Sequence, residues 1–297
     1  MKAWLYILTT GIVFGTGGLV SKHMIDNGLD PVFGTAVMMT ITAIGSIPIY
    51  LCAGGVEARG WRMAMLAGAL NGGGPAMLFN LGFESLPASV NTLIISLGPV
   101  FTALTAHWVA ADDRFTRAKA VGLISSVTGV GFLAGSLSSG PVTGMAFALA
   151  GAAMQGASLL LVKRVATYFR PAATLTAMMT GAALAAFVVT AVTNRWQAPT
   201  SAMWLLMTLL GLSGVAAFGS ILAVSEIAPA SQAALSGYLI PMVGVLGGVI
   251  LFNEPLGWRL ALGAILILTG VVLVGRQNRE PRVGIRVQHG YQPTERN

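Results

Sequence analysis

The sequence predicts an all-α membrane protein of ten transmembrane helices, arranged as two inverted five-helix repeats with the N- and C-termini in the cytoplasm. Composition, regularly spaced apolar segments and an internal repeat lead to this prediction. Of the 297 residues, 55% are hydrophobic and 9% are charged, and the mean hydropathy is +0.77. Soluble proteins have about 25% charged residues, so we expect lipid to cover most of the surface of this chain.

Apolar segments of about 20 residues, the length that crosses a bilayer as a helix, follow one another along the chain. Short polar or glycine- and proline-rich breaks separate them. We expect ten spans, near residues 3–22, 31–52, 62–83, 88–109, 118–135, 143–163, 172–193, 203–224, 230–251 and 257–275. The polar and basic residues 276–297 are predicted to form a disordered cytoplasmic tail.

The distribution of Lys and Arg predicts the orientation. With the N-terminus inside, 14 of the 17 basic residues fall in cytoplasmic segments, and 3 fall outside, namely Lys22, Arg195 and Arg259. Short cytoplasmic connections of membrane proteins are enriched in Lys and Arg. The asymmetry therefore favours cytoplasmic termini and an even number of spans.

The two halves of the chain share residues at a constant offset. Pro87-Ala88-Ser89 and Pro99 recur 142 positions later as Pro229-Ala230-Ser231 and Pro241. Other pairs lie 141 or 142 positions apart: Gly15 and Gly156, Lys22 and Lys163, Glu84 and Glu226, Asp113 and Glu254, Gly129 and Gly270.

The offset predicts a repeat of five spans, the first in residues 1–139 and the second in residues 140–275. Because five is odd, the second copy enters the membrane from the opposite side. Inverted repeats are typical of secondary carriers, in which two halves exchange conformations and expose one site alternately to each side.

These residues resemble the EamA type of the drug/metabolite transporter superfamily. The resemblance covers about residues 3–275 and rests on the two Pro-Ala-Ser…Pro patterns and on Asn253-Glu254-Pro255-Leu256, followed by Gly263 and Gly270. The first half departs from the family pattern, with Ala111-Asp112-Asp113-Arg114 where the glutamate corner would stand.

The resemblance implies a multi-pass carrier of the bacterial inner membrane that exports small metabolites. It is closest to exporters of amino acids, including neutral and aromatic ones. Carriers of drugs or nucleotide sugars are the alternative within transport.

Polar and aromatic groups within the spans mark the expected substrate site, because hydrocarbon penalises polar groups that face neither a cavity nor a partner. Uncharged donors and acceptors suit a neutral or zwitterionic small molecule. Interhelical hydrogen bonding is the alternative role for them. The candidates are Asn71, Phe79, Asn91, Ile95, Ser96, Gln155, Ser158, Gln232, Ser236 and Tyr238.

Prolines and glycines inside the spans are candidate hinges. The run from Asn71 to Pro75 contains three glycines and cannot form a stiff helix. Pro99 and Pro241 each leave a carbonyl one turn earlier without its donor. We therefore expect hinges at Gly73, Pro75, Pro99 and Pro241, with close packing of small residues as the alternative for the glycines.

Charged residues at span ends are candidate gates. Lys22 and Glu84 lie at the predicted outer side, and their repeat counterparts Lys163 and Glu226 lie at the inner side. We hypothesise that they form ion pairs that are made and broken alternately. Ordinary snorkelling of charged side chains to the interface is the alternative.

Several chemistries are not indicated. No Asp or Glu lies in the middle of a predicted span, so proton coupling through a buried carboxylate is not supported. The phosphate-binding pattern G-x-x-x-x-G-K-[ST] is absent, and 1 Cys and 3 His give no catalytic or metal-binding cluster. We expect no enzymatic activity and no cofactor, although a membrane scaffold, a sensor or an intramembrane enzyme are the alternatives from other classes.

The expected partners are a small-molecule substrate and the lipid bilayer. The net charge of +7 comes from short connections and the tail rather than from a nucleic-acid surface. Nothing in the sequence indicates an obligatory protein partner.

Overall fold

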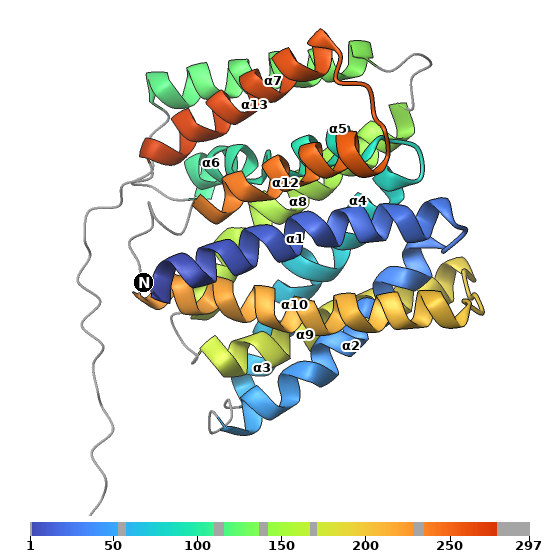
Figure 1. Ribbon diagram of the computed structural model, residues 1–297. Helices are drawn as coiled ribbons and strands as arrows, with labels where there is room; N and C mark the ends of the chain where they lie inside the picture. The colour runs from blue at the N-terminus through green and yellow to red at the C-terminus, as the bar shows by residue number, and fades with distance from the viewer. Residues whose placement is uncertain are drawn as a thin grey trace, which may run out of the picture.

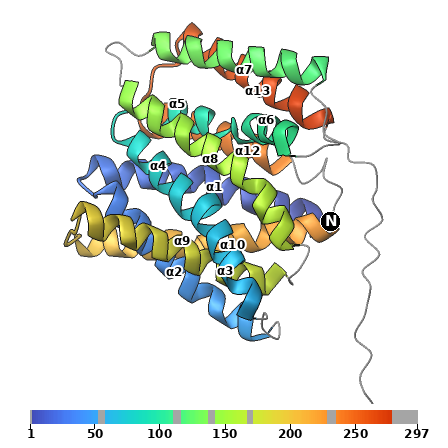
Figure 2. The ribbon, with the colours of Figure 1, turned by 180° about the vertical axis from the view of Figure 1, so that it is seen from behind.

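The computed structural model describes residues 2–52, 58–109, 116–136, 142–166, 171–227 and 235–277, and helices are the regular structure in them. They lie side by side with roughly parallel or antiparallel axes (Figures 1 and 2). The elements are α1 (Lys2–Asp26), α2 (Pro31–Cys52), α3 (Ala58–Gly68), the π-helix η1 (Ala69–Gly73), α4 (Gly74–Phe83), α5 (Ala88–Ile95), α6 (Gly98–Val109), α7 (Arg117–Ser136), α8 (Val142–Ala166), α9 (Pro171–Thr193), α10 (Ser201–Ile227), α12 (Leu235–Leu251) and α13 (Trp258–Gln277).

Within the described residues, 7 helical segments are long and apolar enough to cross a membrane. Two shorter apolar helices, Leu239–Leu251 and Trp258–Val274, accompany them. The prediction of an all-helical membrane protein is confirmed at this level, whereas the number ten stays a prediction. The predicted tail lies outside the described residues beyond Gln277.

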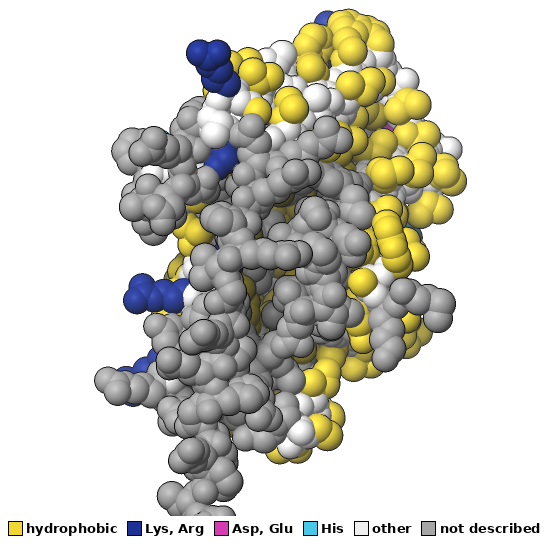
Figure 3. All heavy atoms as spheres, turned by 90° about the vertical axis from the view of Figure 1, so that its left-hand side faces the viewer, with side chains coloured by type: hydrophobic (Ala, Val, Ile, Leu, Met, Phe, Trp, Pro, Cys, Tyr) yellow, Lys and Arg dark blue, Asp and Glu magenta, His cyan; other side chains and the backbone are white. Residues whose placement is uncertain are grey.

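The outside of the bundle is apolar. Large side chains such as Ile124, Val192 and Ile250 are 65%, 80% and 70% exposed. Figure 3 faces the end that holds the N-terminus, where Lys and Arg side chains project and hydrophobic side chains cover the flank. Soluble proteins rarely expose apolar surface so continuously, so lipid is the expected solvent of this flank.

Helices from the two ends of the sequence pack against each other. α1 contacts α10 and α12, and α8 contacts α4 and α6. α2 lies against α10, and α3 lies against α9. Two further pairs, α7 with α13 and α2 with α9, join early and late parts of the chain (Figure 1).

Two of these crossings depend on glycine. A Cβ on Gly15 of α1 would lie 2.5 Å from Cβ of Val243 and 3.2 Å from the carbonyl oxygen of Ile240 in α12. A Cβ on Gly156 of α8 would lie 2.7 Å from Cβ of Phe101 and 2.5 Å from the carbonyl oxygen of Gly98. Small residues let membrane helices approach this closely, so any larger side chain would separate the helices.

The two repeated prolines have different effects on their helices. α5 ends at Ile95 and α6 begins at Gly98, directly before Pro99, and the amide of Leu97 donates to Ile94 O at 3.0 Å in a tighter turn. Pro241, in contrast, lies inside the continuous helix α12. The sequence did not distinguish these outcomes, because the freed carbonyl can be accommodated by either a break or a bend.

Candidate functional site: a polar cluster at a π-helix

The run Asn71-Gly72-Gly73-Gly74-Pro75 forms the π-helix η1 and the start of α4. The amide of Gly74 donates to Ala69 O, five residues earlier, and Pro75 occupies the first turn of α4, where its missing N–H costs nothing. Glycine tolerates the extra residue in the turn. π-Helical turns inside α-helices occur frequently at functional sites, and the composition of this run predicted an irregular helix without predicting its type.

The π-helix brings Asn71 into contact with α8. Asn71 Nδ2 donates to the Gln155 carbonyl at 3.0 Å and to Ser158 Oγ at 3.1 Å. The Ser158 hydroxyl lies 3.0 Å from Leu70 O and 3.1 Å from Gln155 O, so it can donate to either. We call Asn71, Gln155 and Ser158 the polar cluster.

The side chain of Gln155 extends the cluster toward the break between α5 and α6. Its Oε1 would lie 3.2 Å from a Cβ on Gly98, the residue before Pro99. Among the described residues, the Gln155 amide group and Asn71 Oδ1 have no hydrogen-bond partner, and both side chains are only half-buried. The cluster therefore offers free donors and acceptors beside a helix break.

Other predicted site residues are buried or already have hydrogen-bond partners. Asn91 is fully buried, donates to Phe79 O at 2.9 Å and leaves its Oδ1 unpartnered. Ser96 Oγ donates to Leu93 O at 2.6 Å within the same turn. The Asn91 bond joins α5 to α4, as interhelical hydrogen bonding would, whereas the Ser96 bond stays within one turn. Phe79 is buried, and Ile95 is half-buried against the same core.

Part of the predicted site lies outside the described residues. This applies to Gln232 and to the side chains of Ser236, Tyr238 and Glu226. Lys163 is exposed near the end of α8.

The predicted gate residues at the end of α1 and α4 do not pair with each other. Lys22 Nζ lies 2.5 Å from Asp26 Oδ1 in the same helix. Glu84 instead lies 3.9 Å from Arg195 Nη1, in the turn after α9. In this structure, the expected Lys22–Glu84 pair is therefore replaced by two pairs with other partners.

Arg195 belongs to a group of contacts between the α1–α2 turn and the α9–α10 turn. Its Nη1 lies 3.3 Å from Asp30 Oδ2, while Asp30 Oδ1 accepts from the amides of Val32 and Phe33 at 2.9 Å each and caps α2. Gln197 accepts from the Asp30 amide at 2.7 Å and donates to Gly28 O at 2.6 Å. We call Asp30, Glu84, Arg195 and Gln197 the clasp.

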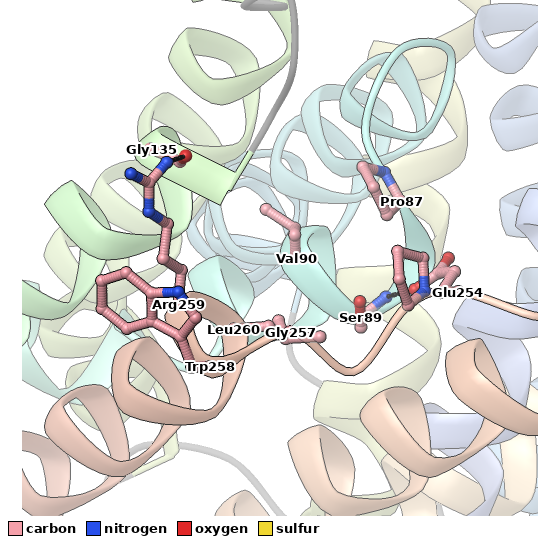
Figure 4. Close-up of a pocket in the computed structure, with 10 residues that line it drawn as sticks. Pro87, Ser89, Val90, Gly135, Glu254, Gly257, Trp258, Arg259 and Leu260 are labelled. Carbon is pink, nitrogen blue, oxygen red and sulfur yellow. Dashed lines mark hydrogen bonds between the residues drawn. The ribbon is translucent and has the colours of Figure 1, made fainter.

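The glutamate of the Asn253-Glu254-Pro255-Leu256 motif also caps a helix. Its Oε1 accepts from the Ala88 amide at 2.5 Å, at the first turn of α5. Its Oε2 accepts from the Ser89 amide at 3.0 Å (Figure 4). A carboxylate at a helix N-terminus is stabilised by the free amides and the helix dipole. The α12–α13 loop is thereby tied to the start of α5.

The same motif and the two halves around it agree with a known family. A sequence model of the EamA-like transporter family matches residues 1–135 and 142–276. The chain belongs to the EamA-like transporter family. The expected resemblance is confirmed at this level, and a non-enzymatic, integral multi-pass membrane protein fits membership of a transporter family.

The chain is also similar to one curated protein and to one solved structure. The chain is 25% identical over 211 residues to the uncharacterized transporter YvbV of Bacillus subtilis (strain 168), covering 68% of each protein. A crystal structure of another protein aligns with a TM-score of 0.65 and 20% identity, over 94% of this chain and 99% of that one. At that identity the second match shows the fold alone.

Proposed function

We propose that this EamA-like chain is a secondary transporter that exports a small neutral or zwitterionic metabolite, with neutral and aromatic amino acids as the leading class. The observation that carries the proposal is the polar cluster, whose Gln155 amide and Asn71 oxygen have no hydrogen-bond partner among the described residues. Asn71 lies midway along α3–η1–α4, and Gln155 lies midway along α8. Polar groups at such a depth are costly unless they serve a cavity or a ligand.

The chemistry of the cluster favours an uncharged or zwitterionic substrate. Its side chains are amides and a hydroxyl, so they offer hydrogen bonds without a fixed charge. Pro99 has no N–H to donate to Ile95 O, and a carbonyl freed in this way suits an ammonium group. The Phe14–Phe218 pair, with ring centroids 5.0 Å apart, supplies aromatic surface between α1 and α10.

Alternating access between two inverted repeats is the proposed mechanism. In its support, the EamA model matches once in each half of the chain. The α1–α12 and α8–α6 crossings use Gly15 with Val243 and Gly156 with Phe101, whose positions differ by 141 and 142. In this proposal α3–η1–α4 and α5–α6 each form one of ten spans, with both termini in the cytoplasm of a bacterial inner membrane.

The clasp is the proposed outer gate. In the proposed orientation it lies on the outer side, where Arg195 joins the α9–α10 turn to Asp30 and Glu84. Closure at this end would leave the substrate site accessible from the cytoplasm, as an exporter requires before loading. Glu84 thus keeps its proposed gate role with Arg195, rather than Lys22, as its partner.

Counterflow in proteoliposomes tests this proposal. Proteoliposomes that contain the purified protein would each be loaded with one unlabelled compound, and uptake of its labelled form would be measured. The compounds would be neutral, aromatic and charged amino acids and phosphorylated sugars. We expect accumulation of at least one neutral or aromatic amino acid. Accumulation of phosphorylated sugars alone would move the function to another metabolite class, and no counterflow with any amino acid would contradict the proposed substrate.

A further inference from the structure

A cavity lies away from the polar cluster, at the same end of the bundle as the clasp (Figure 1). It has a volume of about 300 Å³ and lies between the start of α5, the end of α7 and the α12–α13 loop (Figure 4). Val90 and Leu260 form apolar parts of its wall, and Ser89, Glu254, Trp258 and Arg259 supply its polar and aromatic groups.

The cavity carries one positive and one negative side chain on different sides. In Figure 4, Arg259 lies on one side beside Trp258, Glu254 lies on the other beside Ser89, and Val90 and Leu260 lie between them. The Arg259 guanidinium donates to Gly135 O and lies 5.3 Å from the centroid of the Trp258 ring. Among the described residues, no carboxylate lies within salt-bridge distance of Arg259.

This arrangement distinguishes Arg259 from the other basic residues at the same end. Lys22 Nζ lies 2.5 Å from Asp26 Oδ1, and Arg195 Nη1 lies 3.3 Å from Asp30 Oδ2. Glu254 accepts two amide hydrogen bonds, but each carboxylate oxygen has a further lone pair. The two charges are therefore available to a ligand that carries both signs.

A buried hydroxyl at the cavity wall also lacks a partner. Ser89 is 1% exposed, and its Oγ makes no hydrogen bond in the described part of the chain. A buried polar group without a partner destabilises the folded state, so a bound group that reaches Ser89 would remove this cost.

The surroundings of the cavity point to lipid as the source of the ligand. Trp258 and Leu256 are 63% and 64% exposed beside it, and Ile250 at the end of α12 is 70% exposed. Tryptophan is enriched at the level of lipid headgroups. A headgroup in the cavity would place its acyl chains along this exposed apolar surface.

We propose that this cavity binds the headgroup of a zwitterionic phospholipid, with the phosphate at Arg259 and the ammonium at Glu254. The site is distinct from the polar cluster and does not depend on the identity of the transported molecule. It would tie the α5 and α12–α13 segments to the lipid that surrounds them.

Native mass spectrometry of the full chain in detergent tests the proposal with defined lipids. Phosphatidylethanolamine should bind at least about tenfold more tightly than N-acetylated phosphatidylethanolamine or phosphatidylglycerol, which lack the ammonium, because a hydrogen bond to a charged group is lost. Arg259→Gln should reduce the affinity for phosphatidylethanolamine by a similar factor. Lys22→Gln, which also removes one positive charge at the same end, should leave this affinity unchanged because Lys22 pairs with Asp26 in its own helix.

The lipid series on the unaltered chain keeps the proposal testable if a variant does not fold. Equal affinity for phosphatidylethanolamine and phosphatidylglycerol would overturn the ammonium contact. Unchanged binding by a folded Arg259→Gln protein would overturn the site. If soluble O-phosphoethanolamine or phenylalanine displaced the lipid at equal concentration, the cavity would be a site for free zwitterions and the lipid assignment would be wrong.

Discussion

Gly15 of α1 and Val243 of α12 approach so closely that a Cβ on the glycine would lie 2.5 Å from the valine Cβ. Gly156 of α8 makes the corresponding approach to Phe101 of α6, where the distance would be 2.7 Å. Val243 and Phe101 are on α12 and α6, the helices that contain the repeated prolines Pro241 and Pro99. At these two crossings, the paired helices therefore have no room to move closer together.

Replacing Gly15 or Gly156 by Ala should therefore destabilise the protein. We expect a loss of about 1–3 kcal/mol, the usual cost of inserting a methyl group into a packed interface. Gly131→Ala is the matched control, because a Cβ there would meet nothing within 4 Å. Thermal unfolding in detergent measures the difference, and equal melting temperatures for Gly15→Ala and Gly131→Ala would contradict the close crossing.

Arg195→Gln should open the clasp. An exposed ion pair contributes about 0.2–1 kcal/mol. Its loss should therefore raise the population of the state that is open to the outer side by up to about fivefold. In a Cys52→Ala background, the rate at which an impermeant maleimide labels Leu81→Cys, a half-buried position of α4, would report this opening.

Lys22→Gln is the control for the clasp experiment, because the partner of Lys22 is Asp26 in its own helix. We expect its labelling rate to equal that of the parent protein. A larger effect of Lys22→Gln than of Arg195→Gln would restore the Lys22–Glu84 gate predicted from the sequence and contradict the clasp.

Pro99→Ala should slow transport without reducing stability. Alanine restores an N–H that can donate to Ile95 O, so α5 and α6 could join into one helix. Initial rates of counterflow should fall while the melting temperature stays equal or rises. Pro241→Ala is the informative comparison, since Pro241 lies within a continuous helix. Unchanged counterflow with Pro99→Ala would show that the break has no role in transport.

The apolar composition was sufficient to predict the helices and many of their limits. The expected span 31–52 corresponds to α2 (Pro31–Cys52), and the expected span 62–83 corresponds to α3–η1–α4. A helix that crosses the lipid needs about 20 apolar residues, and segments of this length can be identified directly in the sequence. The Asn-Gly-Gly-Gly-Pro run also indicated an irregular helix.

Contacts between distant residues could not be predicted in this way. Arg195 and Asp30 are 165 positions apart, and Glu254 and Ala88 are 166 positions apart. The gate hypothesis paired Lys22 with Glu84 because both end outer spans, but an aspartate one turn away on the same helix is the nearer partner of Lys22. Which polar side chain faces a neighbouring helix depends on helix rotation, which apolar composition does not encode.

The central claim is that the unpartnered amide of Gln155 binds the transported molecule, and Gln155→Leu tests it most directly. Because this side chain makes no hydrogen bond among the described residues, its loss should leave the melting temperature unchanged. The KM of counterflow in proteoliposomes should rise about tenfold, the cost of one or two substrate hydrogen bonds. Asn27→Ala, an exposed amide in the α1–α2 turn, should leave KM unaltered. A folded Gln155→Leu protein with the KM of the parent would contradict the account.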